Sequence, residues 1–479
     1  MLNFVWTAAL GVIALVVVKI SHWWYRWSNP KCNGKLPPGS MGYPIIGETF
    51  EFFKPHGMYE ISPFVTKRML RYGPMFRTNI LGLKTVVSTE KDVNHEILRQ
   101  ENKSFVLSMP ESFLKMIGKD SMAVNHGKIH KNIKQIALSF IGSESLKRSM
   151  IRDMDRVTRE HLEWNATQGR FEVKDAVSRL ILAQLTPKLI STLKPEIQEK
   201  FIDDVNSFNF EWFRPHFTLY TLKKLFISIK GRRGVMKVIN DAFKRRKESK
   251  EKYGDFLDTI VDNLEKDNSL LNQDSAQSLM FFLYFASHET TSTTTSFAVK
   301  LLSKHPRVLA ELKEEHRAIL ESRENKECGI TFEEYRHKMN FTGMVINEVL
   351  RLINLDPTLF RKAVQDVEIK GYTIPAGWTV VVAPSVAHFD PGVYENPLEF
   401  NPWRWEGKDV RSGSKDFMAF GGGVRQCVGA EFARLQISIF LHYLVTNYNF
   451  SLVKDCEVIR VLGTYLPNEL PIEISPSPK

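Results

Sequence analysis

The stretch that decides the fold is Phe420-Gly421-Gly422-Gly423-Val424-Arg425-Gln426-Cys427-Val428-Gly429, and an apolar helical pattern over residues 430–440 follows it directly. Three consecutive glycines let the backbone take positive φ angles and leave amide donors open before the cysteine. The following helix directs the positive end of its dipole at the sulfur, so both features favour a thiolate at Cys427. A metal-bound thiolate is the expected occupant, and the alternative is a glycine-rich turn around a buried free cysteine.

The three other cysteines, Cys32, Cys328 and Cys456, lie far apart in the chain and form no Cys-x-x-Cys pair. We therefore expect neither a disulfide framework nor a zinc site, and free thiols in a reducing compartment. With 43% hydrophobic and 25% charged residues, the chain can bury a large core, which excludes a disordered protein. The net charge of +11 is spread among many acidic residues without a nucleic-acid-binding motif, so we expect no nucleic-acid partner. A negatively charged membrane surface or an acidic protein suits this charge better.

The N-terminal segment predicts a membrane anchor. Phe4–Ile20 is an apolar run that only Thr7 and Lys19 interrupt, and about 17 residues is the shortest helix that crosses a bilayer. A cleaved signal peptide is the alternative, but the basic start and small-residue cleavage site of such peptides are missing. Positive residues gather after the run, so the bulk of the protein should face the cytoplasm. The predicted organisation is an anchor helix over 1–21, an aromatic and basic flank with a proline-rich hinge over 22–47, and one large domain over 48–479.

The body of the chain predicts a mainly α fold with small β-sheets. Helical spacing of apolar residues covers Ile151–Trp164, Asp255–Leu264, Asp274–Leu302, Pro306–Glu321, Phe341–Leu352 and Glu431–Tyr448. Short β-rich runs bounded by Gly, Pro or charge cover Met75–Ile80, Thr85–Ser88, Val367–Ile374 and Val380–Ala383.

A second constellation lies within the longest predicted helix, where residues 285–291 read Phe-Ala-Ser-His-Glu-Thr-Thr. Glu289 and Thr290 place an acid beside a hydroxyl, a combination that can relay protons to a reacting oxygen. The Thr and Ser residues up to Ser296 can bond back to carbonyls one turn earlier and loosen the helix. A polar helix stripe without chemistry is the alternative.

The cysteine stretch resembles the ligand signature of the cytochrome P450 superfamily, which it matches at every fixed position. Residues 285–291 resemble the oxygen-activating stretch of that family, except that Ser287 replaces a usual Gly. Glu348 and Arg351, followed by Arg404, resemble its Glu-x-x-Arg and Pro-Glu-Arg-Phe elements, although Trp403 and Trp405 depart from the second. The resemblance implies a cytochrome P450 fold with an N-terminal transmembrane helix, and structural roles for Glu348, Arg351 and Arg404.

The same resemblance implies the cofactor haem b, with Cys427 as axial ligand to the iron. Phe420, Gly421 and Gly429 would then belong to the haem-binding loop. The propionates need cationic or donor partners, and the positions that match the family are Arg425, Arg361, His130 and Lys134. For His130 the alternative is a surface histidine on a basic helix.

Within the family the chain is similar to plant microsomal enzymes that oxidise triterpenoids, sterols and brassinosteroids, most clearly over 288–292 and 427–434. This similarity implies a monooxygenase of the endoplasmic reticulum membrane that uses O2 and hydroxylates a lipophilic polycycle. No flavin or nicotinamide motif is present, so electrons should come from NADPH-cytochrome P450 reductase. The alternatives are sequential oxidation with sterol side-chain cleavage, a haem-thiolate isomerase or dehydratase, and a non-catalytic haem or sterol carrier.

The segments that border the substrate pocket in this family match residues 109–122, 212–225, 281–286, 355–359 and 462–466, which are rich in apolar side chains. We expect few charges to point inward. The predicted pocket residues are Phe285, Ala286, Thr358, Leu359, Thr464 and Tyr465, of which Thr358, Thr464 and Tyr465 are candidate partners for a single substrate hydroxyl. About half of the apolar residues in these segments should belong to the core instead.

Overall fold

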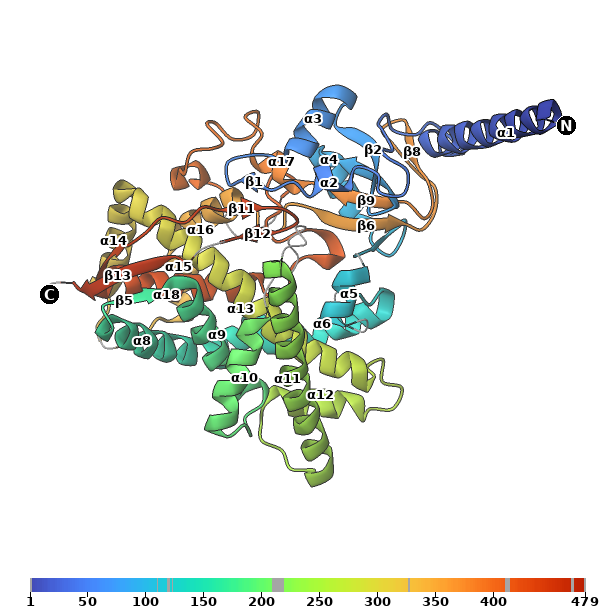
Figure 1. Cartoon of the computed structure of the whole chain (residues 1–479). Helices are drawn as coiled ribbons and strands as arrows, with labels where there is room; N and C mark the ends of the chain where they lie inside the picture. The colour runs from blue at the N-terminus through green and yellow to red at the C-terminus, as the bar shows by residue number, and fades with distance from the viewer. Residues whose placement is uncertain are drawn as a thin grey trace.

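The computed structural model describes residues 2–109, 111–118, 121–122, 124–208, 219–325, 328–409, 414–466 and 469–477. The fold is mainly helical with small sheets, as the sequence predicts. Figure 1 shows a large helical part, through which the long helix α13 (Gln273–Lys304) runs, beside a smaller β-rich part.

The helical part is built around α13, which packs against α9 (Val173–Leu189), α16 (Asn340–Ile353), α18 (Ala430–Asn447) and α11 (Leu219–Ser249). These contacts bury most of α13 from Ser275 to Leu302, so its hydroxyl-rich centre lies inside the molecule. The other helices are α2 (Thr49–Phe52), α3 (Pro63–Tyr72), α4 (Lys91–Arg99), α5 (Glu111–Ile117), α6 (Gly127–Ile141), α7 (Ser143–Ser145), α8 (Ile151–Thr167), α10 (Pro195–Ser207), α12 (Phe256–Leu264), α14 (Pro306–Glu321), α15 (Phe332–His337) and α17 (Pro384–His388).

The β-rich part contains a five-stranded sheet in the order β2-β3-β9-β6-β4. Its strands are β2 (Met75–Ile80), β3 (Leu83–Ser88), β9 (Thr379–Val382), β6 (Leu359–Ala363) and β4 (Phe105–Leu107). Only β3 and β9 run parallel, and the register pairs Val86 with Val380. A two-stranded sheet joins β7 (Val367–Ile369) and β8 (Tyr372–Ile374).

Two three-stranded sheets complete the fold. The first has the order β1-β11-β12, made of His56–Gly57, Ile459–Arg460 and Thr464–Tyr465. The second has the order β10-β13-β5, made of Tyr448–Leu452, Pro471–Pro476 and Arg170–Glu172. The first sheet brings the C-terminal strands β11 and β12 next to the segment that follows α16, where they border the cavity described below.

Local signals explain where several predicted helices begin and end. Asn272 caps α13 by accepting a hydrogen bond from the backbone of Ser275, and Asp255 caps α12 in the same way. Pro306 occupies the first position of α14, where its missing N–H costs nothing. α16 ends at Asn354, whose φ of 42° is left-handed, so the chain turns sharply into residues 355–358.

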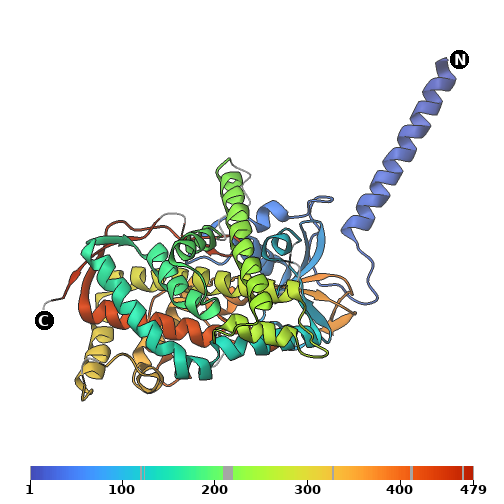
Figure 2. The ribbon, with the colours of Figure 1, turned by 90° about the horizontal axis from the view of Figure 1, so that it is seen from below.

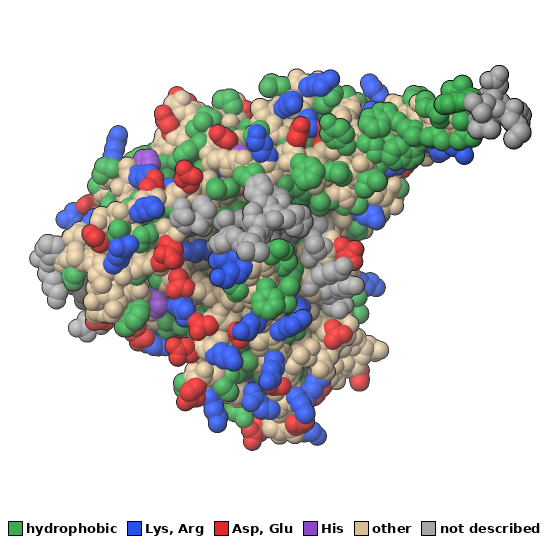
Figure 3. All heavy atoms as spheres, viewed as in Figure 1, with side chains coloured by type: hydrophobic (Ala, Val, Ile, Leu, Met, Phe, Trp, Pro, Cys, Tyr) green, Lys and Arg blue, Asp and Glu red, His purple; other side chains and the backbone are tan. Residues whose placement is uncertain are grey.

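The N-terminal helix α1 (Leu2–Ser28) runs without a break through the aromatic flank and projects from the body in both views (Figures 1 and 2). Apolar side chains along it, from Leu10 to Tyr25, are exposed, and Figure 3 shows them as a continuous green surface. Residues 29–47 then lie against the β-rich part, since Gly39 pairs with Arg77 and Gly47 with Ile80. Within the described part of the chain, no helix combines the length and the apolar character that a membrane crossing requires. The side chains of residues 1–5, 7 and 8 of the predicted span lie outside the described residues.

Candidate cofactor and substrate site

The Cys427 loop is a tight turn that needs glycine at two of its three glycine positions. Gly421 and Gly423 have φ angles of 70° and 62°, and a Cβ on Gly423 would lie 2.2 Å from the carbonyl oxygen of Leu98. The backbone N–H of Cys427 donates to the carbonyl of Phe420 at 3.0 Å and closes the turn. Gly423 is therefore the position where any side chain would collide with α4, whereas Gly421 has open space around it.

The Cys427 side chain has solvent-accessible surface, although protein atoms surround most of it. Burial raises the pKa of this thiol, and the N–H of Gly429 and the charge of Lys134 only oppose that effect. The prediction of a metal-bound thiolate at Cys427 stays a prediction: the Gly429 N–H and Lys134 favour the charged sulfur, and a bound cation would offset the desolvation.

The predicted propionate partners lie around this loop, and two of them, Arg361 and Arg425, share a carboxylate that the sequence does not reveal. Glu101 Oε1 accepts from Arg425 Nε at 2.9 Å, and Glu101 Oε2 lies 2.9 Å from Arg361 Nε. Arg425 also donates to the carbonyls of Met122 and Asn125. Lys134 Nζ donates to two carbonyls of the Cys427 loop, at 2.8 and 3.2 Å. Burial lowers the pKa of Arg361 and of Arg425, and the Glu101 charge opposes it.

His130 lies on α6 and is only 3% exposed. This burial excludes the alternative of a surface histidine on a basic helix. Its Nδ1 is buried and has no hydrogen-bond partner. Burial first, and the charges of Arg425 and Lys134 next, lower the pKa of His130 to about 4, so the ring is neutral at neutral pH.

These residues fit a haem. Haem requires an open thiol ligand and donors for two carboxylates. The accessible Cys427 Sγ would supply the first, and the unsatisfied Nδ1 of His130 with the cations Lys134, Arg361 and Arg425 would supply the second.

On α13, Glu289 and Thr290 both face the cavity. The Thr290 hydroxyl donates to the carbonyl of Ala286 at 2.8 Å. Hydroxyls from Ser287 to Ser296 bond back to carbonyls three or four residues earlier, as predicted, but α13 continues unbroken through this region.

Glu289 is 7% exposed and pairs with Lys174 of α9, whose Nζ lies 3.0 Å from Glu289 Oε1.

The cavity has a volume of about 170 Å³, and its surface is mostly apolar. Its lining residues come from α13, from the segment after α16, from β12 and its preceding turn, and from residues 109 and 113: Met109, Phe113, Glu289, Thr290, Thr293, Leu355, Asp356, Thr358, Phe360, Leu462, Gly463, Thr464 and Tyr465. Two carboxyl side chains, Glu289 and Asp356, are among them, which agrees with the expectation that few charges point inward. Asp356 was missed although it is the only charged residue between Arg351 and Arg361.

Three of the six predicted pocket residues are not part of this lining. Phe285 is 3% exposed and packs against Phe208 and Phe281 in the core. Leu359 lies on β6 next to Phe360, and alternate residues of a strand face opposite sides, so Phe360 lines the cavity and Leu359 packs on the other face. Ala286 is half-buried and contributes its carbonyl to Thr290.

The other three, Thr358, Thr464 and Tyr465, do line the cavity. The Thr464 hydroxyl, however, donates to the carbonyls of Ile353 and Asn354, so its donor is already used. Of the predicted pocket segment 212–225, residues 212–218 lie outside the described residues.

The residues predicted to be structural form one buried cluster. Glu348 accepts two hydrogen bonds from Arg351, at 2.8 and 2.9 Å, and one from Arg404 at 2.9 Å. Trp405 Nε1 also donates to Glu348, at 3.0 Å. Trp405, one of the two tryptophans that depart from the family pattern, therefore adds a further hydrogen bond to the same carboxylate, which leaves the buried charge well satisfied.

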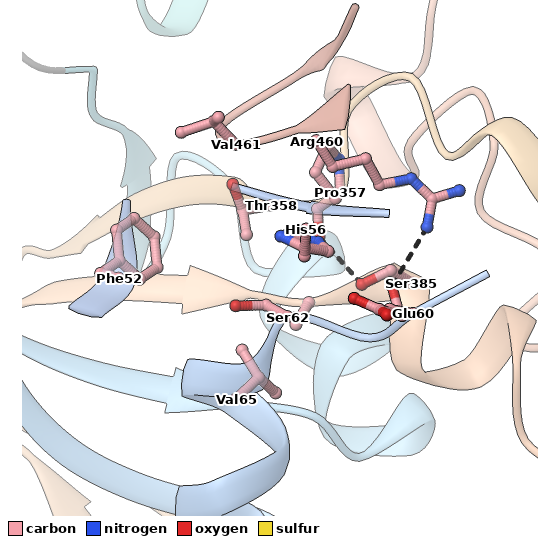
Figure 4. A pocket seen from close by; sticks show the side chains of 11 residues that line it. Phe52, His56, Glu60, Ser62, Val65, Pro357, Thr358, Ser385, Arg460 and Val461 are labelled. Carbon is pink, nitrogen blue, oxygen red and sulfur yellow. Dashed lines mark hydrogen bonds between the residues drawn. The ribbon is translucent and has the colours of Figure 1, made fainter. Parts of the chain in front are cut away.

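A second, much smaller cavity of about 10 Å³ lies behind the segment after α16, and Thr358 lines both cavities (Figure 4). On this side the Ser385 hydroxyl donates to the carbonyl of Pro357 at 3.4 Å. Arg460, which is 1% exposed, donates to the carbonyls of Leu352, Ile353 and Glu60. Burial lowers the pKa of Arg460 to about 9.

Comparison with known proteins identifies a matching family, two similar relatives and a similar solved structure. The family model for cytochrome P450 matches residues 37–474. The chain is 59% identical over 476 residues to "Cytochrome P450 708A2" of Arabidopsis thaliana, which covers 99% of this chain and 100% of that protein. It is 36% identical over 456 residues to "Cucurbitadienol 11-hydroxylase" of Siraitia grosvenorii, covering 93% of this chain and 94% of that protein. The solved structure titled "Retinoic acid bound cyanobacterial CYP120A1" is 24% identical with a TM-score of 0.77 over 93% of this chain and 100% of that chain, which shows the same fold.

Proposed function

This chain belongs to the cytochrome P450 family and is a monooxygenase of the oxidoreductase class, and on that premise we propose that it hydroxylates a rigid, lipophilic polycycle of triterpene or sterol type. The observation that carries this proposal is the cavity of about 170 Å³ whose apolar walls meet Thr290 and Glu289 on α13. An apolar cavity of this kind selects a ligand mainly by shape. The plant relative whose printed name states that it hydroxylates cucurbitadienol supports the substrate class.

The family implies haem as the cofactor, and we propose haem b held by Cys427. The bound haem supplies the activation of O2. His130, Lys134, Arg361 and Arg425 would hold its propionates. The overall reaction consumes one O2, one NADPH and one proton per substrate, and it yields the alcohol, water and NADP⁺.

The residues of α13 would deliver the protons that this reaction needs. Lys174 is partly exposed, with 23% of its side chain accessible, and it pairs with the buried Glu289. The pair therefore joins the protein surface to the cavity wall. We propose that Glu289 passes protons through water to the Thr290 hydroxyl, which holds them at Oγ1 beside the reacting oxygen.

We propose NADPH-cytochrome P450 reductase as the electron donor, because the chain has no flavin or nicotinamide motif of its own. We also propose that the apolar run Phe4–Ile20 anchors the protein in the endoplasmic reticulum membrane with its body facing the cytoplasm.

The test combines binding and turnover. Purified protein is titrated with triterpenes, sterols and fatty acids while the haem spin state is followed. Microsomes that contain both the protein and the reductase are incubated with the same compounds, and mass spectrometry detects products that gain one oxygen atom. We expect a spin shift with at least one polycycle and its hydroxylated product. A spin shift with fatty acids but with no polycycle would overturn the proposal. Binding without NADPH-dependent O2 uptake would indicate a carrier.

A further inference from the structure

Most polar groups on the cavity wall already have partners within the protein. Among the described lining residues, Glu289 is paired with Lys174, and the hydroxyls of Thr290 and Thr293 donate to carbonyls of α13. The Thr464 hydroxyl donates to two carbonyls at the end of α16. These groups keep their positions without a ligand.

Asp356 and Thr358 differ from the rest of the wall. Thr358 is 9% exposed, and its buried hydroxyl oxygen has no hydrogen-bond partner. Asp356 is open to the cavity, and the backbone N–H of Thr358 is a hydrogen-bond donor to its carboxyl group. A buried hydroxyl without a partner and a carboxyl with unused acceptor sites are both costly inside an apolar cavity. A ligand group that hydrogen-bonds to both would remove that cost.

The segment that carries these two side chains is held from behind. The Ser385 hydroxyl donates to the carbonyl of Pro357, and Arg460 donates to the last carbonyls of α16, as Figure 4 shows in part. The turn at Asn354 fixes the start of the segment. Asp356 and Thr358 are therefore presented to the cavity before a ligand arrives, which lowers the entropic cost of binding.

Building on the proposed function, we propose that Asp356 and Thr358 form a polar subsite that binds a hydroxyl group already present on the polycyclic substrate. The enzyme would then take an alcohol rather than the bare hydrocarbon, and the hydrogen bonds at this subsite would fix which part of the polycycle lies beside Thr290.

A hydroxyl suits this subsite better than an amine. Burial raises the pKa of Asp356 to about 7, while the charge of Arg361 and the N–H of Thr358 oppose that rise. Near neutral pH the carboxyl group is therefore both an acceptor, when ionised, and a donor, when protonated. A hydroxyl matches either form, whereas a protonated amine matches only the ionised one.

The experiment compares ligands that differ in one hydroxyl. The haem-loaded protein is titrated with β-amyrin and with the hydrocarbon that lacks its hydroxyl, and with cholesterol and the corresponding cholestene, while the spin state is followed. We expect the alcohol of a pair to bind about tenfold more tightly than the hydrocarbon. Asp356→Ala should abolish this preference, and Asp356→Asn, which still hydrogen-bonds, should keep most of it. The band of the reduced carbon-monoxide complex reports whether each variant is folded and loaded.

Leu355→Ala is the matched control, because Leu355 lines the same cavity next to Asp356 without a polar group. It should weaken both ligands of a pair equally. Thr358→Val keeps the side-chain shape and should lower the preference for the alcohol over the hydrocarbon. If the Asp356 variants do not load haem, this variant tests the subsite in their place.

The outcomes separate this inference from the proposed function. Polycycle binding with the same preference in Asp356→Ala and Thr358→Val as in the wild type would overturn the inference alone. Tighter binding of an aminosterol than of cholesterol would overturn it in favour of a cationic ligand. No spin shift with any polycycle, together with a shift by fatty acids, would overturn the proposed function itself.

Discussion

Lys174 Nζ lies 3.0 Å from Glu289 Oε1, so a residue of α9 holds the carboxylate that stands next to Thr290 in the sequence. The pair is buried on the Glu289 side and partly exposed on the Lys174 side. Breaking it leaves a buried carboxylate without its cation, which disfavours the ionised form.

We predict that Lys174→Gln slows proton delivery to the cavity. Product formation should fall, and the solvent deuterium isotope effect on turnover should rise, because proton transfer becomes more rate-limiting. Lys188→Gln is the matched control: Lys188 lies on the same helix and pairs with Asp153, away from the cavity. An unchanged isotope effect in Lys174→Gln would show that protons enter by another route.

We predict that Thr290→Ala still accepts electrons but loses much of them as peroxide. The hydroxyl that holds the proton is gone, so product per NADPH should fall roughly tenfold, less than the about 100-fold that a positioned proton donor contributes elsewhere, because water can replace it in part. The measurement is product and peroxide per NADPH consumed. Thr295→Ala serves as the control, since the Thr295 hydroxyl bonds to the Thr291 carbonyl and is fully buried away from the cavity lining. Equal coupling in Thr290→Ala and the wild type would contradict the role of Thr290.

We predict that Cys427→Ala abolishes the spectral band of thiolate ligation in the reduced carbon-monoxide complex. Only this cysteine stands in a glycine-bearing turn before a helix, and its side chain is accessible. Cys328→Ala removes an exposed thiol and should leave the band intact. If the band persists in Cys427→Ala, another residue is the axial ligand.

The sequence predicts those parts of the fold whose signals are local. Helix α14 (Pro306–Glu321) and strand β2 (Met75–Ile80) have the predicted ends. A proline starts the helix, and Gly and Pro residues bound the strand, so both signals are readable from neighbouring positions. α9 was not predicted, because apolar residues occur all around it and Pro187 lies inside it, which removes the periodic signal.

The site is less predictable because its partners lie far apart in the chain. Glu101 is 324 residues from Arg425, and Lys174 is 115 residues from Glu289, so no spacing rule links them. The sequence also does not show which side of a helix meets the cavity. Phe285 is predicted to line the pocket, but the turn before it, Phe281-Phe282-Leu283, is apolar on all sides and gives no polar face that would mark the cavity side.

We predict that Glu101→Gln destabilises the haem-loaded protein. Glu101 is 3% exposed and joins Arg361 to Arg425, so its neutralisation leaves two buried guanidinium groups without that anion. Removing one partner of a buried ion pair costs about 3–5 kcal/mol, and bound propionates should offset part of this. Thermal unfolding followed by circular dichroism and by the Soret band measures the effect. Glu96→Gln, on the surface of α4, is the control. A wild-type midpoint in Glu101→Gln would mean that the two arginines need no carboxylate.

The last prediction concerns the pH dependence of stability and the buried His288. Its Nδ1 is 2.9 Å from the Ser178 hydroxyl, and its Nε2 is buried without a partner. Burial first, and the charge of Lys174 next, lower the pKa of His288 to about 3 from an ordinary value of 6.5. In the unfolded chain the imidazole takes up a proton below pH 6.5, whereas in the folded protein it does so only near pH 3. The unfolded state therefore binds more protons between these values, so stability is full above pH 6.5 and falls as the pH decreases, by up to about 1.4 kcal/mol per pH unit for this group.

His288→Gln should keep the hydrogen bond to Ser178 and flatten this pH dependence of stability, which unfolding midpoints between about pH 5 and pH 7.5 would reveal. His337→Gln, at a side chain that is 73% exposed, should leave the dependence as in the wild type. If His288→Gln and His337→Gln lose stability with the same slope as the wild type, His288 is protonated in the folded protein at mildly acidic pH, and a carboxylate or water must reach its Nε2.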